Sequence, residues 1–206
     1  SPPPGTILYN LEQIQAGSTW MSPALLELFR RFPTWDYSQR NVEALAALGV
    51  PRPTLVPIGW APALERISPA VEDVDILFYG SLNTRRQALL ERLGESGAQV
   101  EALVGVYGAE RDAWVARSKL VLNVHFYEAK VFEAVRVSYL LGNGRVVVSE
   151  TGSSPEEESA FAPGLAFAPY EDLAATCHRL LNDAAERARL SAAGRLGDGD
   201  GGIAGL

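Results

Sequence analysis

The residues best suited to chemistry follow the apolar run "DILFYG", in the stretch "GSLNTRRQALL". Gly80 and Ser81 form a small turn there, and Arg85 and Arg86 fall at the start of the helix predicted by the next residues. Backbone N–H groups at a helix N-terminus, together with a guanidinium group, suit a diphosphate. Arginines at this end oppose the helix dipole. We therefore expect at least one of them to bind phosphate, the alternative being a solvated turn with incidental arginines.

A second group of polar residues lies in "NVHFYEAKVFEAVR", after another apolar run. Lys130 and Glu133 are spaced to lie one turn apart on one face of a helix predicted over residues 129–141. A lysine here could reach a phosphate, and a glutamate could accept hydrogen bonds from two ribose hydroxyls. The alternative is a surface ion pair worth less than ~1 kcal/mol. His125 is a second candidate for function, although a single histidine after a strand is more often a structural residue than a catalytic one.

A third group follows the β-branched run in "RVVVSETGSSPEE". Thr151 and Gly152, with the two serines after them, are small enough to let a ligand approach the backbone closely. Glu150 is expected to point into the same cleft. The alternative is a loop that simply precedes a short acidic helix.

Metal-binding motifs are weak in this chain. The "DVD" at residues 73–75 matches a metal-binding DxD pattern, but it precedes its strand and so belongs to the wrong end of a sheet. "DGDGG" near residue 200 lacks the later acidic ligand of a calcium loop. A single cysteine, Cys177, excludes a cysteine zinc cluster. The sequence therefore predicts no metal and no cofactor.

Composition limits the partners. The net charge of −7 argues against nonspecific nucleic-acid binding, which needs a basic face. The longest apolar runs fall short of the ~18–20 residues of a membrane-spanning helix, and no signal peptide is evident. We therefore expect a cytoplasmic protein.

The elements that must position these residues alternate regularly. Apolar strand-like runs and amphipathic helical patterns follow one another, which predicts an α/β fold with a Rossmann-like parallel sheet covered by helices on both faces. We expect this domain over residues 69–194. Residues 1–68 predict a smaller α/β portion and a linker, and residues 195–206 a disordered Gly/Asp-rich tail. In such sheets ligands bind at the carboxyl ends of the strands, where all three groups fall.

The segment "FEAVRVSYLLGNGRVVVSETGS", combined with "FYGSLNTRRQALLERL", resembles the donor-binding part of GT-B glycosyltransferases, of the spore-coat and capsule type. The resemblance covers about residues 75–180. It implies a metal-independent enzyme that transfers a sugar from a nucleotide-sugar donor, such as a UDP-sugar, in glycan or polysaccharide assembly. Implied acceptors are a glycan, a lipid-linked or a protein acceptor, and peripheral membrane association is compatible with it. It also implies that residues 1–68 correspond to a partial or reduced acceptor-side domain.

The resemblance also implies roles for single residues. Glu133 matches the second glutamate of the family's E-x7-E motif, which holds the nucleotide ribose. Lys130, with one of the two arginines, would neutralise the diphosphate while the glycine–serine turn closes on it. The first glutamate of the motif is replaced by His125, so His125 and nearby Glu128 are the candidate catalytic groups.

Two other classes of function stay open. The chain could be a nucleotide or nucleotide-sugar binding module without transfer activity, which its length and His125 favour. It could also be a flavodoxin-like interaction domain, which the bare α/β pattern favours. The basic "YGSLNTRR" argues against the flavodoxin-like domain, because a receiver domain of that fold needs acidic residues clustered after its first strand.

Overall fold

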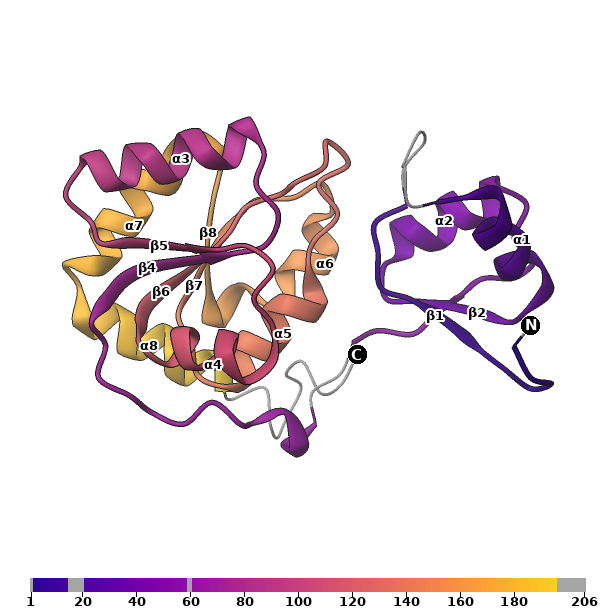
Figure 1. Ribbon diagram of the computed structural model, residues 1–206, viewed down its shortest axis with the longest axis horizontal. Coiled ribbons are helices and arrows are strands. Elements are labelled where there is room, and N and C mark those ends of the chain that lie inside the picture. The colour runs from indigo at the N-terminus through magenta and orange to yellow at the C-terminus, as the bar shows by residue number, and fades with distance from the viewer. Residues whose placement is uncertain (1, 15–20, 59–60, 196–206) are drawn as a thin grey trace. The chain divides into compact units, whose positions relative to one another are not determined.

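A computed structural model of the chain describes residues 2–14, 21–58 and 61–195 (Figure 1). The chain forms two compact units, Ser1–Ile58 and Gly59–Leu206. Residues 59–68, the end of the portion expected to include a linker, therefore belong with the second unit. The reason lies in Asn143, whose side-chain oxygen accepts hydrogen bonds from the backbone N–H groups of Arg66 and Ile67, both at 2.9 Å. The expected tail falls outside the described residues, apart from its first one.

The first unit contains a three-stranded parallel sheet and two helices. The strands β1 (Leu8–Asn10), β2 (Thr34–Asp36) and β3 (Thr54–Leu55) lie in chain order. The helices are α1 (Pro23–Arg31) and α2 (Gln39–Ala47). α1 begins as its sequence predicts, because the Ser22 side chain accepts a hydrogen bond from the Leu25 N–H at 3.2 Å and proline follows it. A small apolar core holds the unit together: Ile14, Phe29, Leu45 and Val50.

The second unit is built on a five-stranded parallel sheet, as the sequence predicts. Its order is β5-β4-β6-β7-β8, so the chain leaves β4 for β5 on one side and returns to β6 on the other. In parallel sheets, ligands bind where the strand order reverses in this way. Here that point is the carboxyl ends of β4 and β6. The strands are β4 (Val74–Tyr79), β5 (Val100–Leu103), β6 (Ser118–Asn123), β7 (Val147–Glu150) and β8 (Leu165–Ala168).

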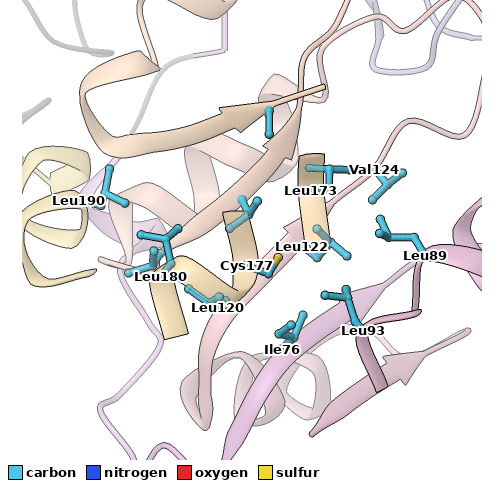
Figure 2. Close-up of a cluster of buried hydrophobic side chains, with 13 residues drawn as sticks. Ile76, Leu89, Leu93, Leu120, Leu122, Val124, Leu173, Cys177, Leu180 and Leu190 are labelled. Atoms are coloured by element: carbon cyan, nitrogen blue, oxygen red, sulfur yellow. The ribbon is translucent and has the colours of Figure 1, made fainter. Parts of the chain in front are cut away.

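Helices cover both faces of this sheet (Figure 1). Because side chains alternate along a strand, Leu120 packs towards α3 and α7, and its neighbour Val121 packs towards α4 and α5. Figure 2 shows the first of the two cores, which includes the buried Cys177. The helices are α3 (Thr84–Glu95), α4 (Gly108–Ala116), α5 (Ala134–Gly142), α6 (Pro155–Ser159), α7 (Leu173–Leu181) and α8 (Ala184–Arg195), with short 3-10 turns η1 (Pro62–Leu64), η2 (Ala162–Gly164) and η3 (Tyr170–Asp172).

One expected helix begins later than the sequence predicts. The helical pattern over residues 129–141 is correct only from Ala134 onwards, where α5 begins. Lys130 has a left-handed backbone, with φ of 48°, which interrupts a helix at that position. The next two residues are apolar and fully buried, and Phe132 packs against Phe161 at a ring distance of 4.9 Å. An irregular loop over 124–133 therefore connects β6 to α5, and Lys130 and Glu133 do not share a helix face.

Candidate functional site

The turn after β4 needs glycine at residue 80. Gly80 has φ of 134°, and a Cβ added there would lie 3.2 Å from the Arg136 guanidinium and 3.7 Å from that of Arg86. The backbone therefore passes close to two guanidinium groups, which a larger residue would obstruct. Ser81, next in the turn, is exposed. Arg136, whose other contacts include the Asn123 side chain at 3.1 Å, was not expected from the sequence.

The two arginines at the start of α3 differ in burial and in the groups that they contact. Arg86 is only 4% exposed and donates to the carbonyl oxygens of Ser81 and Val124. Burial, together with the charge of the neighbouring Arg136, lowers the pKa of Arg86 to about 10. Arg86 therefore braces the β4 turn against the end of β6. Arg85, one-third exposed, is the arginine that faces outwards.

Arg85 and Lys130 are held side by side by one buried carboxylate. Glu150, the last residue of β7, has a side chain that is 0% exposed, and Arg85 donates to both of its oxygens. The Lys130 ammonium lies 3.0 Å from the same carboxylate, and the His125 backbone N–H donates to it at 3.2 Å. Burial alone would raise the pKa of Glu150, but Arg85 and Lys130 lower it below its ordinary value. Because the carboxylate is buried and both cations are partly exposed, the cations lie on its solvent side.

The backbone around Lys130 is fixed by the loop after β7. The Lys130 carbonyl accepts from the Ser153 N–H at 3.1 Å. A Cβ added at Gly152 would lie 2.7 Å from that carbonyl oxygen and 3.2 Å from His125 Nε2, and would also collide with Glu158. Only glycine fits there, so the small-residue loop serves to seat the 124–133 loop. Thr151 donates its N–H to the Ala168 carbonyl of the neighbouring strand.

His125 and Glu133 meet directly. His125 Nδ1 lies 3.1 Å from a Glu133 oxygen, and the Asn123 side chain donates to the same carboxylate at 3.0 Å. Burial would raise the pKa of Glu133, but hydrogen bonds from His125 and Asn123 and the charge of Arg136 lower it. An ionised carboxylate can only accept, so Nδ1 carries the proton of this contact. Glu128 is exposed on the same loop.

A further carboxylate lies nearby, and sequence reasoning missed it. Glu158, on α6, is buried and accepts the Gly152 N–H. Burial raises the pKa of Glu158, although the Gly152 N–H and the charge of His125 oppose the shift. His125 Nε2, which is also close to Gly152, is buried without a hydrogen-bond partner among the described residues.

Charged side chains are concentrated in this cluster. Four permanent cations and three carboxylates lie close together here. In a chain whose net charge is −7, so many guanidinium and ammonium groups in one place favour an anion. The members are Arg85, Arg86, Lys130 and Arg136, and Glu133, Glu150 and Glu158.

Of the two metal-binding motifs rejected in the sequence, only "DVD" lies within the described residues. Asp73 and Asp75 pair with Arg117 and Lys119 at the amino ends of β4 and β6, away from the cluster. "DGDGG" lies outside the described residues. Over residues 2–14, 21–58 and 61–195, no group of three or more His, Cys, Asp or Glu side chains could hold a metal ion. In the same ranges, no helix is both long and apolar enough to cross a membrane.

Comparison with known proteins extends these observations. No protein-family model matches the chain. Two uncharacterised proteins of Acanthamoeba polyphaga mimivirus are 30% and 31% identical to it, over 50% and 37% of this chain. The chain spans only 12% and 11% of their lengths, so these matches concern a part of each relative.

Solved structures resemble the chain over most of its length. HepE of Anabaena, in complex with UDP and glucose, matches 92% of this chain with a TM-score of 0.67 at 14% identity, and the match covers 65% of HepE. Sucrose-phosphate synthase of Thermosynechococcus elongatus matches 92% with a TM-score of 0.60, again at 14% identity and over 62% of that protein. AviGT4, a glycosyltransferase involved in avilamycin A biosynthesis, matches 84% at a TM-score of 0.52 and 16% identity, over 59% of its chain. The fold is therefore of the GT-B glycosyltransferase type, as the sequence resemblance implied.

Proposed function

We propose that this chain binds a nucleoside-diphosphate sugar at the carboxyl ends of β4, β6 and β7, and that it forms part of a glycosyltransferase. The observation that carries the proposal is the pair of outward-facing cations, Arg85 and Lys130, fixed on the buried Glu150. The sheet brings this pair to the point where parallel sheets bind ligands. HepE, which has a similar fold, was solved with UDP and with UDP-glucose. UDP-sugars are therefore the first donors to test.

In this proposal the two cations bind the diphosphate. As the bond between the sugar and the diphosphate breaks, negative charge grows on the leaving diphosphate, and fixed cations stabilise that charge without a metal ion. The backbone of Gly80 and Ser81, with Thr151 and Gly152, lines the same end of the sheet. The acceptor hydroxyl, on a glycan, a lipid-linked or a protein acceptor, forms a bond to the sugar carbon as the bond to the diphosphate breaks, and its proton passes to an oxygen of the departing diphosphate. The product would belong to glycan or polysaccharide assembly.

The proposal assigns the remaining polar groups to the nucleotide and the sugar. Glu133 receives hydrogen bonds from Asn123 and His125, and a carboxylate has lone pairs for further donors such as ribose hydroxyls. His125 and Glu128 are the candidates for contact with the transferred sugar. Of these two, His125 is already oriented by Glu133, whereas Glu128 is exposed on the loop.

Nucleotide binding is the first test. Thermal shift and calorimetry with UDP, GDP, ADP, TDP and CMP should show one nucleotide that stabilises the protein, by about 2.7 kcal/mol at 100 times its Kd. Arg85→Ala and Lys130→Ala should each weaken that binding about ten-fold. Lys119→Ala is the matched control, because Lys119 is a similarly exposed lysine paired with Asp75 at 2.7 Å at the opposite end of the sheet. Failure of all five nucleotides to bind, or an equal loss with the control, would overturn the proposal.

A measurement of donor turnover then distinguishes a glycosyltransferase from a binding module. A non-catalytic nucleotide-sugar binding module is the second candidate, favoured by the histidine that stands where the family has its first glutamate and whose side chain is fully buried here. Release of UDP from UDP-glucose, with and without added glycan acceptors, supports transfer. Tight donor binding without any release, in wild-type protein and at high enzyme concentration, supports the binding module.

A further inference from the structure

Tyr170 holds Arg85 from two directions. It lies in η3, just beyond the carboxyl end of β8, and its ring centroid is 3.8 Å from the centre of the Arg85 guanidinium. Its hydroxyl donates to the Arg85 carbonyl oxygen at 2.6 Å. Nothing in the sequence pattern pointed to this residue. It is more than eighty residues away from its partner.

These contacts complete the immobilisation of the guanidinium. Glu150 receives hydrogen bonds from both terminal nitrogens of Arg85, which fixes the edge of the planar group. The Tyr170 ring lies against the guanidinium group, which restricts its rotation. A guanidinium has five N–H bonds. Arg85 directs some of them at Glu150 and one at the His125 carbonyl oxygen, at 3.4 Å, and the others remain for a ligand. Arg85 is therefore oriented before any ligand arrives, which removes an entropic cost from binding.

We propose that Tyr170 is a positioning residue, and that by orienting Arg85 it makes the site selective for nucleoside diphosphates over monophosphates. This inference rests on the proposed function, because it concerns the same site. In this inference the Arg85 guanidinium, held by Glu150 and facing outwards, contacts the terminal phosphate of the diphosphate. A purely structural tyrosine, pinning α3 to the end of β8, would stabilise the fold without affecting which phosphate is recognised.

The test compares a diphosphate with its monophosphate. Calorimetry gives the Kd of UDP and of UMP, or of the corresponding pair for whichever nucleoside the wild-type protein binds. Tyr170→Leu removes the ring, and the ratio of the two affinities should fall about five- to ten-fold, almost entirely through weaker diphosphate binding. Tyr170→Phe keeps the ring and should retain most of the ratio.

Two comparisons connect the effect to Arg85. Combining Tyr170→Leu with Arg85→Ala should lower the ratio no further than Arg85→Ala alone, because the tyrosine acts through the arginine. Arg92→Ala is the matched control: this exposed arginine of α3 is 6.0 Å from the same ring and should leave the ratio unchanged. If the Tyr170→Leu variant does not fold, the Arg85→Lys variant is tested in its place, because lysine keeps the charge but has no planar group to orient. The ratio of diphosphate to monophosphate affinity should fall in this variant too.

The outcomes separate this inference from the proposed function. Wild-type protein that binds no nucleotide overturns both. Wild-type protein that prefers the diphosphate, with a Tyr170→Leu variant that loses both ligands equally or neither, leaves the proposed function intact and overturns the inference. A further loss in the double variant, beyond that of Arg85→Ala, also overturns it.

Discussion

Replacing Glu150 by glutamine removes the charge at the centre of the site with almost no change in size. The carboxylate accepts from Arg85, from Lys130 at 3.0 Å and from the His125 N–H at 3.2 Å. A glutamine keeps one acceptor oxygen, but its NH₂ group would face N–H donors. We expect the free energy of unfolding of the second unit to fall at neutral pH.

The size of the loss follows from which partners are buried. Removing one member of a fully buried ion pair costs about 3–5 kcal/mol, because the remaining charge stays without water. Here the buried member is the one removed, and Arg85 and Lys130, 33% and 41% exposed, can hydrate in its absence. The variant loses the charge-assisted hydrogen bonds to Glu150. Part of this loss is offset, because a neutral glutamine costs less free energy to bury than a carboxylate. We therefore expect a loss of about 2 kcal/mol.

The loss should depend on pH in a defined direction. Interactions with Arg85 and Lys130 lower the pKa of Glu150 in the folded protein below the ordinary value of 4.5, despite its burial. Its stabilising contribution is therefore complete above the unfolded-state pKa and is lost as the pH falls through the folded-state pKa. The difference between wild type and Glu150→Gln should be largest near pH 7 and shrink steadily below about pH 4.5.

Urea unfolding followed by pulsed hydrogen exchange and mass spectrometry is the suitable assay, because peptides from β6 and β7 report on the second unit alone. Asp75→Asn serves as the control: this carboxylate also pairs with a lysine, Lys119, at 2.7 Å, but it is partly exposed and lies at the other end of the sheet. Its loss should cost less than about 1 kcal/mol. A Glu150→Gln variant as stable as wild type at pH 7, or a deficit that does not change between pH 7 and pH 3.5, would refute the reasoning.

Two further predictions concern packing. Gly152→Ala should destabilise the second unit by about 1–3 kcal/mol, because the new methyl would lie 2.7 Å from the Lys130 carbonyl oxygen and against Glu158. Gly94→Ala is the control and should be neutral or stabilising, because its methyl would meet nothing within 4 Å. Equal thermal midpoints for the two variants would contradict this prediction. Cys177 is fully buried, and burial raises its pKa to about 12. A disulfide exchange reagent at pH 8 should therefore modify this thiol only after the protein unfolds. Rapid modification of the native protein would show that Cys177 does not lie in the core.

Much of the fold followed from local patterns. The Ser22–Pro23 helix start and the strands that precede Gly80 and Thr151 were correctly predicted, since capping and alternation depend on neighbouring residues. The helix before Ala134 was predicted too long. Val131 and Phe132 have apolar spacing that suits a helix, but they are buried from a loop in which Lys130 is left-handed. Tertiary packing outweighed the helical pattern there.

The candidate site was harder to predict than the fold. Sequence placed Arg85 and Arg86 together but could not decide which one is buried, because that depends on the direction of α3 after its Asn83 cap. Lys130 and Glu133 are close in sequence, yet they contact different partners, Glu150 and His125. Arg136, Glu158 and Tyr170 reach the cluster from later elements. Identifying them requires the order of the strands in space, which no local pattern contains.

The Asn143 contacts determine where the protein can be cut. Its side chain, 2% exposed, accepts from the N–H groups of Arg66 and Ile67 and donates to the Leu64 carbonyl at 2.9 Å. A recombinant second unit that starts at residue 69 would lack all three partners. The Asn143 side-chain oxygen would then lose both of its donors, and the NH₂ group would keep only the Tyr139 carbonyl, at 2.8 Å. One that starts at residue 61 keeps them. Dissection of this protein should therefore begin before Pro62, upstream of the segment that the sequence alone marks as a linker.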